Sequence, residues 1–124
     1  MEKWIYLIFG GIAGTAARYI FSGMVYDRLG AGFPYGTLVV NLSGCFLIGF
    51  LDALFEEKFL LSPNVRVLLL AGFCGAYTTF STFMLETSNL IKDGEHLRAF
   101  LNVAVSVIAG FVVFRLGIWL AKVI

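Results

Sequence analysis

The sequence has few charged residues, prolines, cysteines and histidines. Of its 124 residues, 14% are charged, two are proline, two are cysteine and one is histidine. Soluble domains carry about 25% charged residues, so a water-soluble globular protein is excluded, because this chain lacks the polar groups to cover its surface. The low proline content and the absence of low-complexity tracts exclude a disordered chain. Cys45 and Cys74 lie in apolar stretches without metal-ligand spacing, which indicates inert packing.

The chain is instead rich in apolar residues. Hydrophobic residues make up 60% of it and aromatic residues 16%, with a mean hydropathy of +0.91. They form four runs, at about 4–26, 33–54, 64–91 and 99–123. A helix crosses a bilayer with about 20 apolar residues, and these runs are too long for barrel strands. The first run lacks a signal-peptide cleavage site, so we expect it to be retained. We predict an all-α membrane protein in which residues 1–124 form a single domain of four transmembrane helices.

The basic residues are almost evenly divided between the two sides of the predicted bundle. The terminal side carries five and the other side four, namely Lys3, Lys58, Arg66, Arg115 and Lys122 against Arg18, Arg28, Lys92 and Arg98. Because an excess of Lys and Arg normally marks the cytoplasmic side, this bias of one predicts insertion in both orientations. Such dual topology allows an antiparallel homodimer around a two-fold axis in the membrane plane. The alternative is a single orientation fixed by other factors.

The middle of the third run is unfavourable for a helix. Gly72 and Gly75 precede a hydroxyl-rich stretch at 78–82, and glycine and β-branched threonine both weaken helices. We predict that the third helix is broken at mid-membrane, where freed carbonyls can coordinate a cation. The alternative is a continuous, kinked helix whose Ser and Thr side chains bond back to their own turn. Pro63 suits the start of this helix, and Ser62 is a candidate cap.

Two phenylalanines follow the predicted break. Phe80 and Phe83 are three residues apart and therefore share one helix face. The edge of an aromatic ring is electropositive, so ring edges turned into a pore favour a small anion, with Ser81 and Thr82 supplying hydroxyl donors at the same height. The alternative is that the two rings only pack against lipid or neighbouring helices.

Polar residues also stand inside the second and fourth runs. Asn41 lies near mid-depth in the second run, where an amide either joins helices or lines a pathway. In the fourth run, Asn102, Ser106 and Gly110 recur every four residues and form one stripe. This stripe is either a hydrogen-bonding track for an ion or a close helix contact.

The first run combines glycines with one buried charge. Gly10 and Gly14 have the small-xxx-small spacing that lets helices pack closely. Arg18, one turn further on, must pair or face water, so it either attracts anions or anchors a carboxylate or exposed carbonyls. Glu86, about 10 Å of helix rise beyond Thr79, is predicted at the mouth of any pore.

These residues together resemble the CrcB/Fluc family of small fluoride channels along essentially the whole chain. The matching segments are 11–19, 34–41 and 72–83, the last being the most specific. Tyr77 stands where many family members have Phe or Leu. The resemblance implies a dual-topology antiparallel homodimer that exports fluoride passively through two antiparallel pores in the cytoplasmic (inner) membrane.

The resemblance also implies roles for individual residues. Phe80 and Phe83 would contact fluoride with their ring edges, and Asn41 would position it by hydrogen bonding. The implied polar pore lining is Ser81, Thr82, Asn102 and Ser106. Asn102 and Gly110 depart from the hydroxyl-rich family pattern. A structural sodium ion at the dimer centre would be held by main-chain oxygens of Gly75 and Thr78. The implied partners are fluoride, a second copy of the chain and the lipid bilayer, with no nucleic acid.

Three other function classes fit the residues less well. A proton-coupled exporter needs a membrane-embedded carboxylate, whereas the first run has none and Glu86 is predicted near an interface. A non-conducting assembly subunit would leave the break in the third helix without a purpose. No nucleophile, base and orienting partner can be combined, so we expect no enzyme activity.

Overall fold

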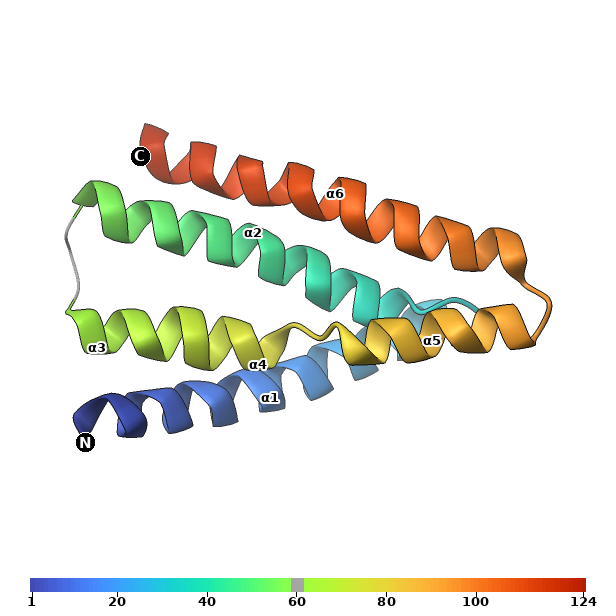
Figure 1. Cartoon of the computed structure of the whole chain (residues 1–124), viewed down its shortest axis with the longest axis horizontal. Coiled ribbons are helices and arrows are strands. Elements are labelled where there is room, and N and C mark those ends of the chain that lie inside the picture. The colour runs from blue at the N-terminus through green and yellow to red at the C-terminus, as the bar shows by residue number, and fades with distance from the viewer. Residues whose placement is uncertain (59–61) are drawn as a thin grey trace.

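The computed structural model describes residues 1–58 and 62–124, and the secondary structure within these ranges is helical throughout (Figure 1). The elements are α1 (Glu2–Leu29), α2 (Tyr35–Lys58), α3 (Pro63–Arg66), η1 (Val67–Cys74), α4 (Gly75–Tyr77), α5 (Ser81–Lys92) and α6 (His96–Val123), of which η1 is a π-helix. Four helical stretches are long and apolar enough to cross a membrane: Glu2–Leu29, Tyr35–Lys58, Pro63–Lys92 and His96–Val123. The predicted four-helix, all-α membrane architecture is confirmed for the described residues.

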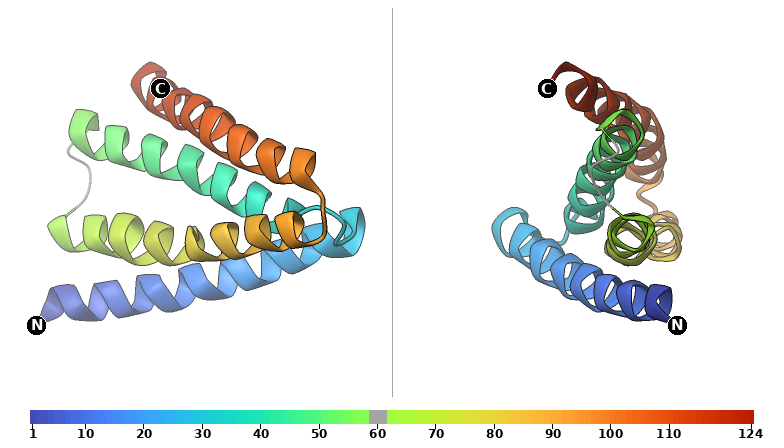
Figure 2. Two further views of the ribbon diagram at one scale, coloured as in Figure 1. Left: turned by 45° about the vertical axis from the view of Figure 1, so that its right-hand side comes forward. Right: turned by 90° about the vertical axis from the view of Figure 1, so that its left-hand side faces the viewer.

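The four stretches form two closely packed pairs. Helix α2 runs along α6, and α1 runs along η1 and α4, as both views in Figure 2 show. Helix α5 continues beyond α4 and contacts α6 and α2. Both chain termini lie at the same end of the molecule (Figure 1). The segment between α4 and α5 therefore lies part-way along the bundle.

Glycines allow the helices within each pair to approach closely. A Cβ atom at Gly10 or Gly14 would overlap backbone atoms of η1, whereas Gly11 has nothing within 4 Å. Between α2 and α6, a Cβ at Gly49 or Gly117 would overlap a backbone carbonyl of the facing helix. Small residues at such contacts let the backbones pack by van der Waals attraction, which drives helix association in lipid.

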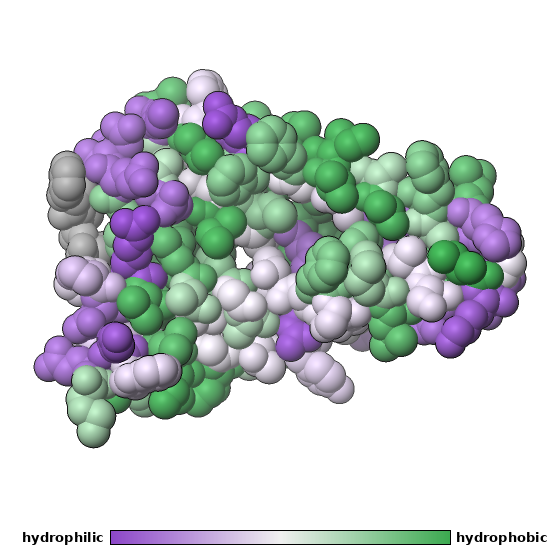
Figure 3. All heavy atoms as spheres, in the orientation of Figure 1, coloured by the Kyte–Doolittle hydropathy of each residue, from purple (hydrophilic) through white to green (hydrophobic). Residues whose placement is uncertain are grey.

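Polar interactions secure both ends of the bundle. At the terminal end, Ser62 Oγ accepts the backbone N–H of Val65 at 3.4 Å, and Arg66 pairs with Asp52 at 2.7 Å. At the other end, Arg98 Nη1 donates to the carbonyl of Gly32 at 2.9 Å. Figure 3 shows hydrophilic residues gathered mainly at these two ends of the visible face. This distribution is the one expected of helices that end at the two surfaces of a bilayer.

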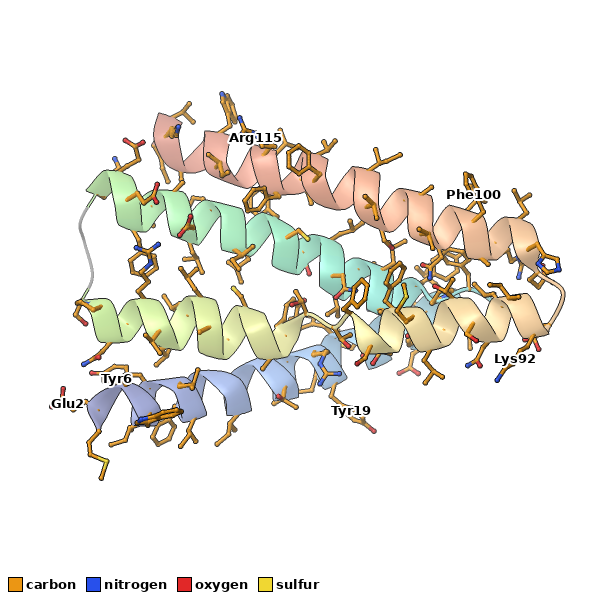
Figure 4. All side chains as sticks on the ribbon, in the orientation of Figure 1. Glu2, Tyr6, Tyr19, Lys92, Phe100 and Arg115 are labelled. Atoms are coloured by element: carbon orange, nitrogen blue, oxygen red, sulfur yellow. The ribbon has the colours of Figure 1, made fainter. Side chains whose placement is uncertain are left out.

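The outward faces of α1 and α6 are apolar and exposed. Phe9 is 64% exposed and Phe111 66%. Tyr19 and Phe100 project away from the bundle from the same two helices (Figure 4). A water-soluble monomer rarely exposes such continuous apolar surface. These faces suit contact with lipid or with another protein chain.

Candidate functional site

The site is built around the non-helical residues 78–80 between α4 and α5. Thr78 has φ −85° and ψ 157°, an extended conformation, and α5 begins at Ser81. The N–H of Thr78 bonds the carbonyl of Cys74 at 3.1 Å, and the Thr78 hydroxyl donates to the same oxygen at 2.9 Å. At the start of α5, the N–H of Thr82 donates to Thr79 Oγ1 at 3.3 Å. The Thr79 hydroxyl therefore caps a backbone N–H at the start of α5, whereas the Thr78 hydroxyl gives the Cys74 carbonyl a second donor beside its helical one.

Asn41 of α2 binds the backbone of this segment directly. Its Nδ2 donates to the carbonyl oxygen of Thr79 at 2.9 Å, and its Oδ1 accepts the Thr79 N–H at 2.8 Å. One side chain thus satisfies both backbone groups of Thr79, as a neighbouring strand would. In a continuous helix the Thr79 N–H would bond the carbonyl of Gly75, so the Asn41 contact leaves that oxygen without its helical donor.

A pocket of about 330 Å³ adjoins this segment, between α2, α4, α5 and α6. The visible face of the molecule is hollowed near its middle (Figure 3). The lining of the pocket combines amide, hydroxyl and aromatic side chains with apolar and thiol groups: Asn41, Gly44, Cys45, Ile48, Cys74, Gly75, Thr78, Thr79, Phe80, Phe83, Ser106 and Val107. Four of the predicted site side chains, from α2, α5, α6 and the segment before α5, therefore line one concavity, namely Asn41, Phe80, Phe83 and Ser106. A mostly apolar pocket with a few convergent polar groups is the usual form of a small-ligand site.

The two phenylalanines differ in exposure. Their ring centroids are 5.8 Å apart and the ring planes are inclined by 58°. Phe83 is only 6% exposed, whereas Phe80 is 73% exposed. Phe83 therefore belongs to the chain's own core beside the pocket, and the ring of Phe80 has most of its surface free for another molecule.

The stripe on α6 divides into three different environments. Asn102 is 1% exposed, and its Nδ2 donates to Thr87 Oγ1 at 2.9 Å. Thr87 in turn donates to the carbonyl of Phe83 at 2.7 Å. Ser106 lines the pocket, and a Cβ at Gly110 would lie 3.6 Å from Cys45 Sγ on α2. The stripe therefore combines a polar pocket residue with helix contacts on either side of it.

Arg18 reaches the same region from α1. Its Nε donates to the carbonyl of Ala76 at 3.0 Å. Ala76 belongs to the short helix α4, whose last carbonyls lack helical donors because the backbone leaves the helix at Thr78. Of the two interpretations of Arg18 from the sequence, this contact supports anchoring of exposed carbonyls. The guanidinium also brings a positive charge to the depth of residues 75–78.

Glu86 lies further along α5, and its carboxylate is held by two hydroxyl groups. Tyr26 Oη donates to Glu86 Oε2 at 2.7 Å, and Thr37 Oγ1 donates to Glu86 Oε1. Neither Tyr26 nor Thr37 was among the predicted site residues. Thr37 could have been found, because it precedes Asn41 by four residues and so shares its helix face. The sequence gives no comparable signal for Tyr26, which lies 60 residues from its partner.

Ser81 and Thr82 occupy the first turn of α5. Ser81 is exposed, and Thr82 is half-buried. Among the described residues that line the pocket, neither Ser81 nor Thr82 is found, and Asn102 is also not among them. Within one copy of the chain, the geometry thus brings four of the seven predicted pathway residues to one pocket and leaves these three beside it.

Comparison with known proteins identifies the family. The family described as CrcB-like protein, Camphor Resistance (CrcB), matches residues 5–118. Proteins named "Fluoride-specific ion channel FluC" include one from Maridesulfovibrio salexigens, 43% identical over 100% of this chain and 98% of the relative, and one from Solidesulfovibrio magneticus, 44% identical over 100% and 99%. One from Hydrogenovibrio crunogenus is 47% identical over 92% of this chain and 86% of the relative. The family assignment made from the sequence is confirmed. The chain is a multi-pass membrane protein of the CrcB family, whose relatives named here are ion channels and not enzymes.

Proposed function

We propose that this protein is a fluoride-selective channel that lets fluoride leave the cell passively across the cytoplasmic membrane. The pocket beside residues 78–80 carries this proposal, because it combines Asn41, two phenylalanine rings and Ser106 at mid-bundle. The names of the full-length relatives support the same ion. The proposed pathway passes these residues and includes Ser81, Thr82 and Asn102, with Glu86 near one end. Arg18 anchors the Ala76 carbonyl beside the middle of the pathway.

Fluoride must exchange its water shell for protein groups in such a pathway. Removing an unpaired charge from water costs far more than an aromatic edge returns, which is about 1 kcal/mol per ring. Hydrogen bonds from the Asn41 amide and the hydroxyl of Ser106 must therefore share the task with Phe80 and Phe83, since bonds to a charged group are the stronger kind. Fixed donors around a narrow path exclude chloride, which is too large to fit between them. Rapid passage further requires that no single site binds the ion too tightly.

We further propose that two copies assemble as an antiparallel, dual-topology homodimer with two pores. The 73% exposed ring of Phe80 supports this arrangement, because a partner chain would cover it and complete the aromatic lining. The exposed apolar faces of α1 and α6 provide surface for both the partner and lipid. Arg18 lies inside the bundle at Ala76, so it no longer counts among the basic residues outside the membrane. The terminal side then carries five Lys and Arg residues and the other side three. This bias is still small enough for insertion in both directions.

The interrupted third helix would carry a structural sodium ion at the centre of this dimer. The Gly75 carbonyl lacks its usual donor, because the Thr79 N–H bonds Asn41. Among the described residues, no hydrogen-bond donor is found for the Thr78 carbonyl. Carbonyl oxygens released from a helix are suitable ligands for Na⁺, so these two residues fit the ion, with the same two from the second copy. Bound there, sodium would supply a fixed positive charge that favours anion entry.

The function is tested with purified protein in liposomes loaded with potassium fluoride or potassium chloride. Release is followed by a fluoride or chloride electrode after a potassium ionophore is added. We expect fast fluoride release and chloride release no faster than from protein-free liposomes. Equal release of both anions, or release of neither, would overturn the proposal.

The topology is tested separately by the accessibility of an N-terminal protease site in sealed vesicles. Insertion in both orientations predicts cleavage of about half of the subunits from outside and of the remainder only after permeabilisation. Cleavage of all subunits from one side would refute dual topology without affecting the proposed ion selectivity.

A further inference from the structure

Three polar side chains form a cluster where α1, α2 and α5 meet. Tyr26 Oη and Thr37 Oγ1 each donate to a different oxygen of the Glu86 carboxylate, the Tyr26 bond being 2.7 Å long. The two hydroxyl oxygens lie 3.4 Å apart, and Thr37 is only 6% exposed. One carboxylate is therefore held at both oxygens by donors from two other helices.

The ring of Tyr26 is fixed by packing on α2. A Cβ atom at Gly36 would overlap the Tyr26 ring, so the ring lies directly against the α2 backbone and its hydroxyl has a defined direction. Beyond the cluster, at the end of the bundle opposite the chain termini, lies a second pocket of about 380 Å³, and its lining includes Tyr26 and Glu86. The cluster thus stands between this pocket and the phenylalanine pair.

The position of Glu86 matters for an anion that passes Phe83. Glu86 follows Phe83 by three residues, about 4.5 Å along the helix axis, and the two side chains share one face of α5. A carboxylate at this position repels an anion. Burying the charged carboxylate in a medium of low dielectric also costs free energy unless hydrogen-bond donors stabilise it. Within the described ranges, Tyr26 is the sole hydrogen-bond donor to Glu86 Oε2.

We propose that Tyr26 is a positioning residue that holds the Glu86 carboxylate against α1 and α2, away from the anion pathway. This inference rests on the proposed fluoride channel. Without the phenol hydroxyl, Glu86 Oε2 loses its donor, and the carboxylate, then held only by Thr37 at Oε1, can turn toward Phe83. The ring itself still packs on Gly36 in a phenylalanine variant, so the fold is retained while the negative charge moves.

The test is fluoride release from liposomes by Tyr26→Phe. Loss of one hydrogen bond to a charged group predicts release about tenfold slower than wild type. Tyr19→Phe is the matched control, because Tyr19 is 82% exposed on the same helix, and it should release fluoride at the wild-type rate. In a Glu86→Gln background there is no charge to position, so adding Tyr26→Phe should change nothing. Wild-type release by Tyr26→Phe, or equal slowing in both backgrounds, overturns the proposal.

Infrared spectroscopy gives a second readout that needs no ion flux. The carboxylate stretching band that is absent in Glu86→Gln should shift in Tyr26→Phe and keep its position in Tyr19→Phe. A band that Tyr26→Phe leaves unshifted overturns the proposal, even if Glu86→Gln conducts no fluoride. Failure of the wild-type protein to release fluoride would instead refute the channel function, and the infrared result would still report on the cluster.

Discussion

Asn41→Asp keeps the size of the side chain but replaces an N–H donor with a negatively charged oxygen. The remaining oxygen can still accept the Thr79 N–H, which wild-type Asn41 binds at 2.8 Å. The Thr79 carbonyl, which receives a 2.9 Å bond from Asn41 Nδ2, loses its donor and faces a carboxylate oxygen. An unsatisfied carbonyl costs about 1–3 kcal/mol when fully buried, so this part-buried group destabilises the backbone at residues 78–80 by up to about that much.

The new charge also acts on the transported ion. Two unit charges about 5 Å apart repel by about 3 kcal/mol at an effective dielectric constant of about 20. Since about 1.4 kcal/mol corresponds to a tenfold change in rate, fluoride release should fall by more than about a hundredfold. Liposome efflux measures this rate, and size-exclusion chromatography checks that the assembly is intact.

Asn64→Asp is the matched control for this substitution. Asn64 is half-buried at the terminal end of the bundle, where its Nδ2 donates to Glu2 Oε2 at 3.2 Å in a solvent-exposed bond, so the same chemical change lies far from the pocket. We expect release by Asn64→Asp within about twofold of wild type, because exposed charges are well screened. Unchanged release by Asn41→Asp would refute the assignment of Asn41 to the pathway.

Three further substitutions have distinct expected outcomes. Phe80→Ile should slow fluoride release by about tenfold without changing the elution volume of the purified protein, because isoleucine has no electropositive edge; wild-type efflux would contradict this role. Arg18→Met should lower the free energy of unfolding by about 1–3 kcal/mol, since the Ala76 carbonyl loses its donor, and unchanged thermal unfolding in detergent would refute this anchor. Gly14→Ala should destabilise by about 1–3 kcal/mol through overlap with an η1 carbonyl, whereas Gly11→Ala should not; equal melting temperatures would disprove the close contact.

The membrane architecture could be predicted because hydrophobicity alone identifies helices that cross lipid. The ends of the helices are less predictable from the same signal. The first apolar run ends at residue 26, but α1 continues through Asp27 and Arg28 to Leu29, because helix and hydrocarbon need not end together. The helix stops at Gly30, whose φ of 82° is the left-handed conformation that glycine tolerates.

The site was only partly predictable, because its polar groups are paired across helices. Asn41, Phe83 and Ser106 stand out in apolar runs, since a polar or aromatic residue at a given depth is visible in the sequence. Their partners are not visible. The bond from Asn102 to Thr87 and the bond from Tyr26 to Glu86 depend on how helices pack, which hydropathy and spacing do not determine.

The π-helical winding of η1 was likewise not predicted. Its eight residues are almost entirely apolar, and nothing in their spacing distinguishes i→i+5 from i→i+4 bonding. This segment packs against Gly10 and Gly14 of α1 and leads directly into α4 and the non-helical residues. The close contact with α1 therefore accompanies a local change of helix type just before the candidate site.

We expect fluoride, and not chloride or a cation, to pass through this protein. Reversal potentials in planar bilayers test it most directly, with fluoride on one side, chloride on the other and the same cation at equal concentration on both. For a fluoride-selective channel we expect a reversal potential that follows the fluoride gradient and does not move when chloride is replaced by a large impermeant anion. A reversal potential that follows chloride or the cation, or a bilayer that carries no current in fluoride, would contradict it.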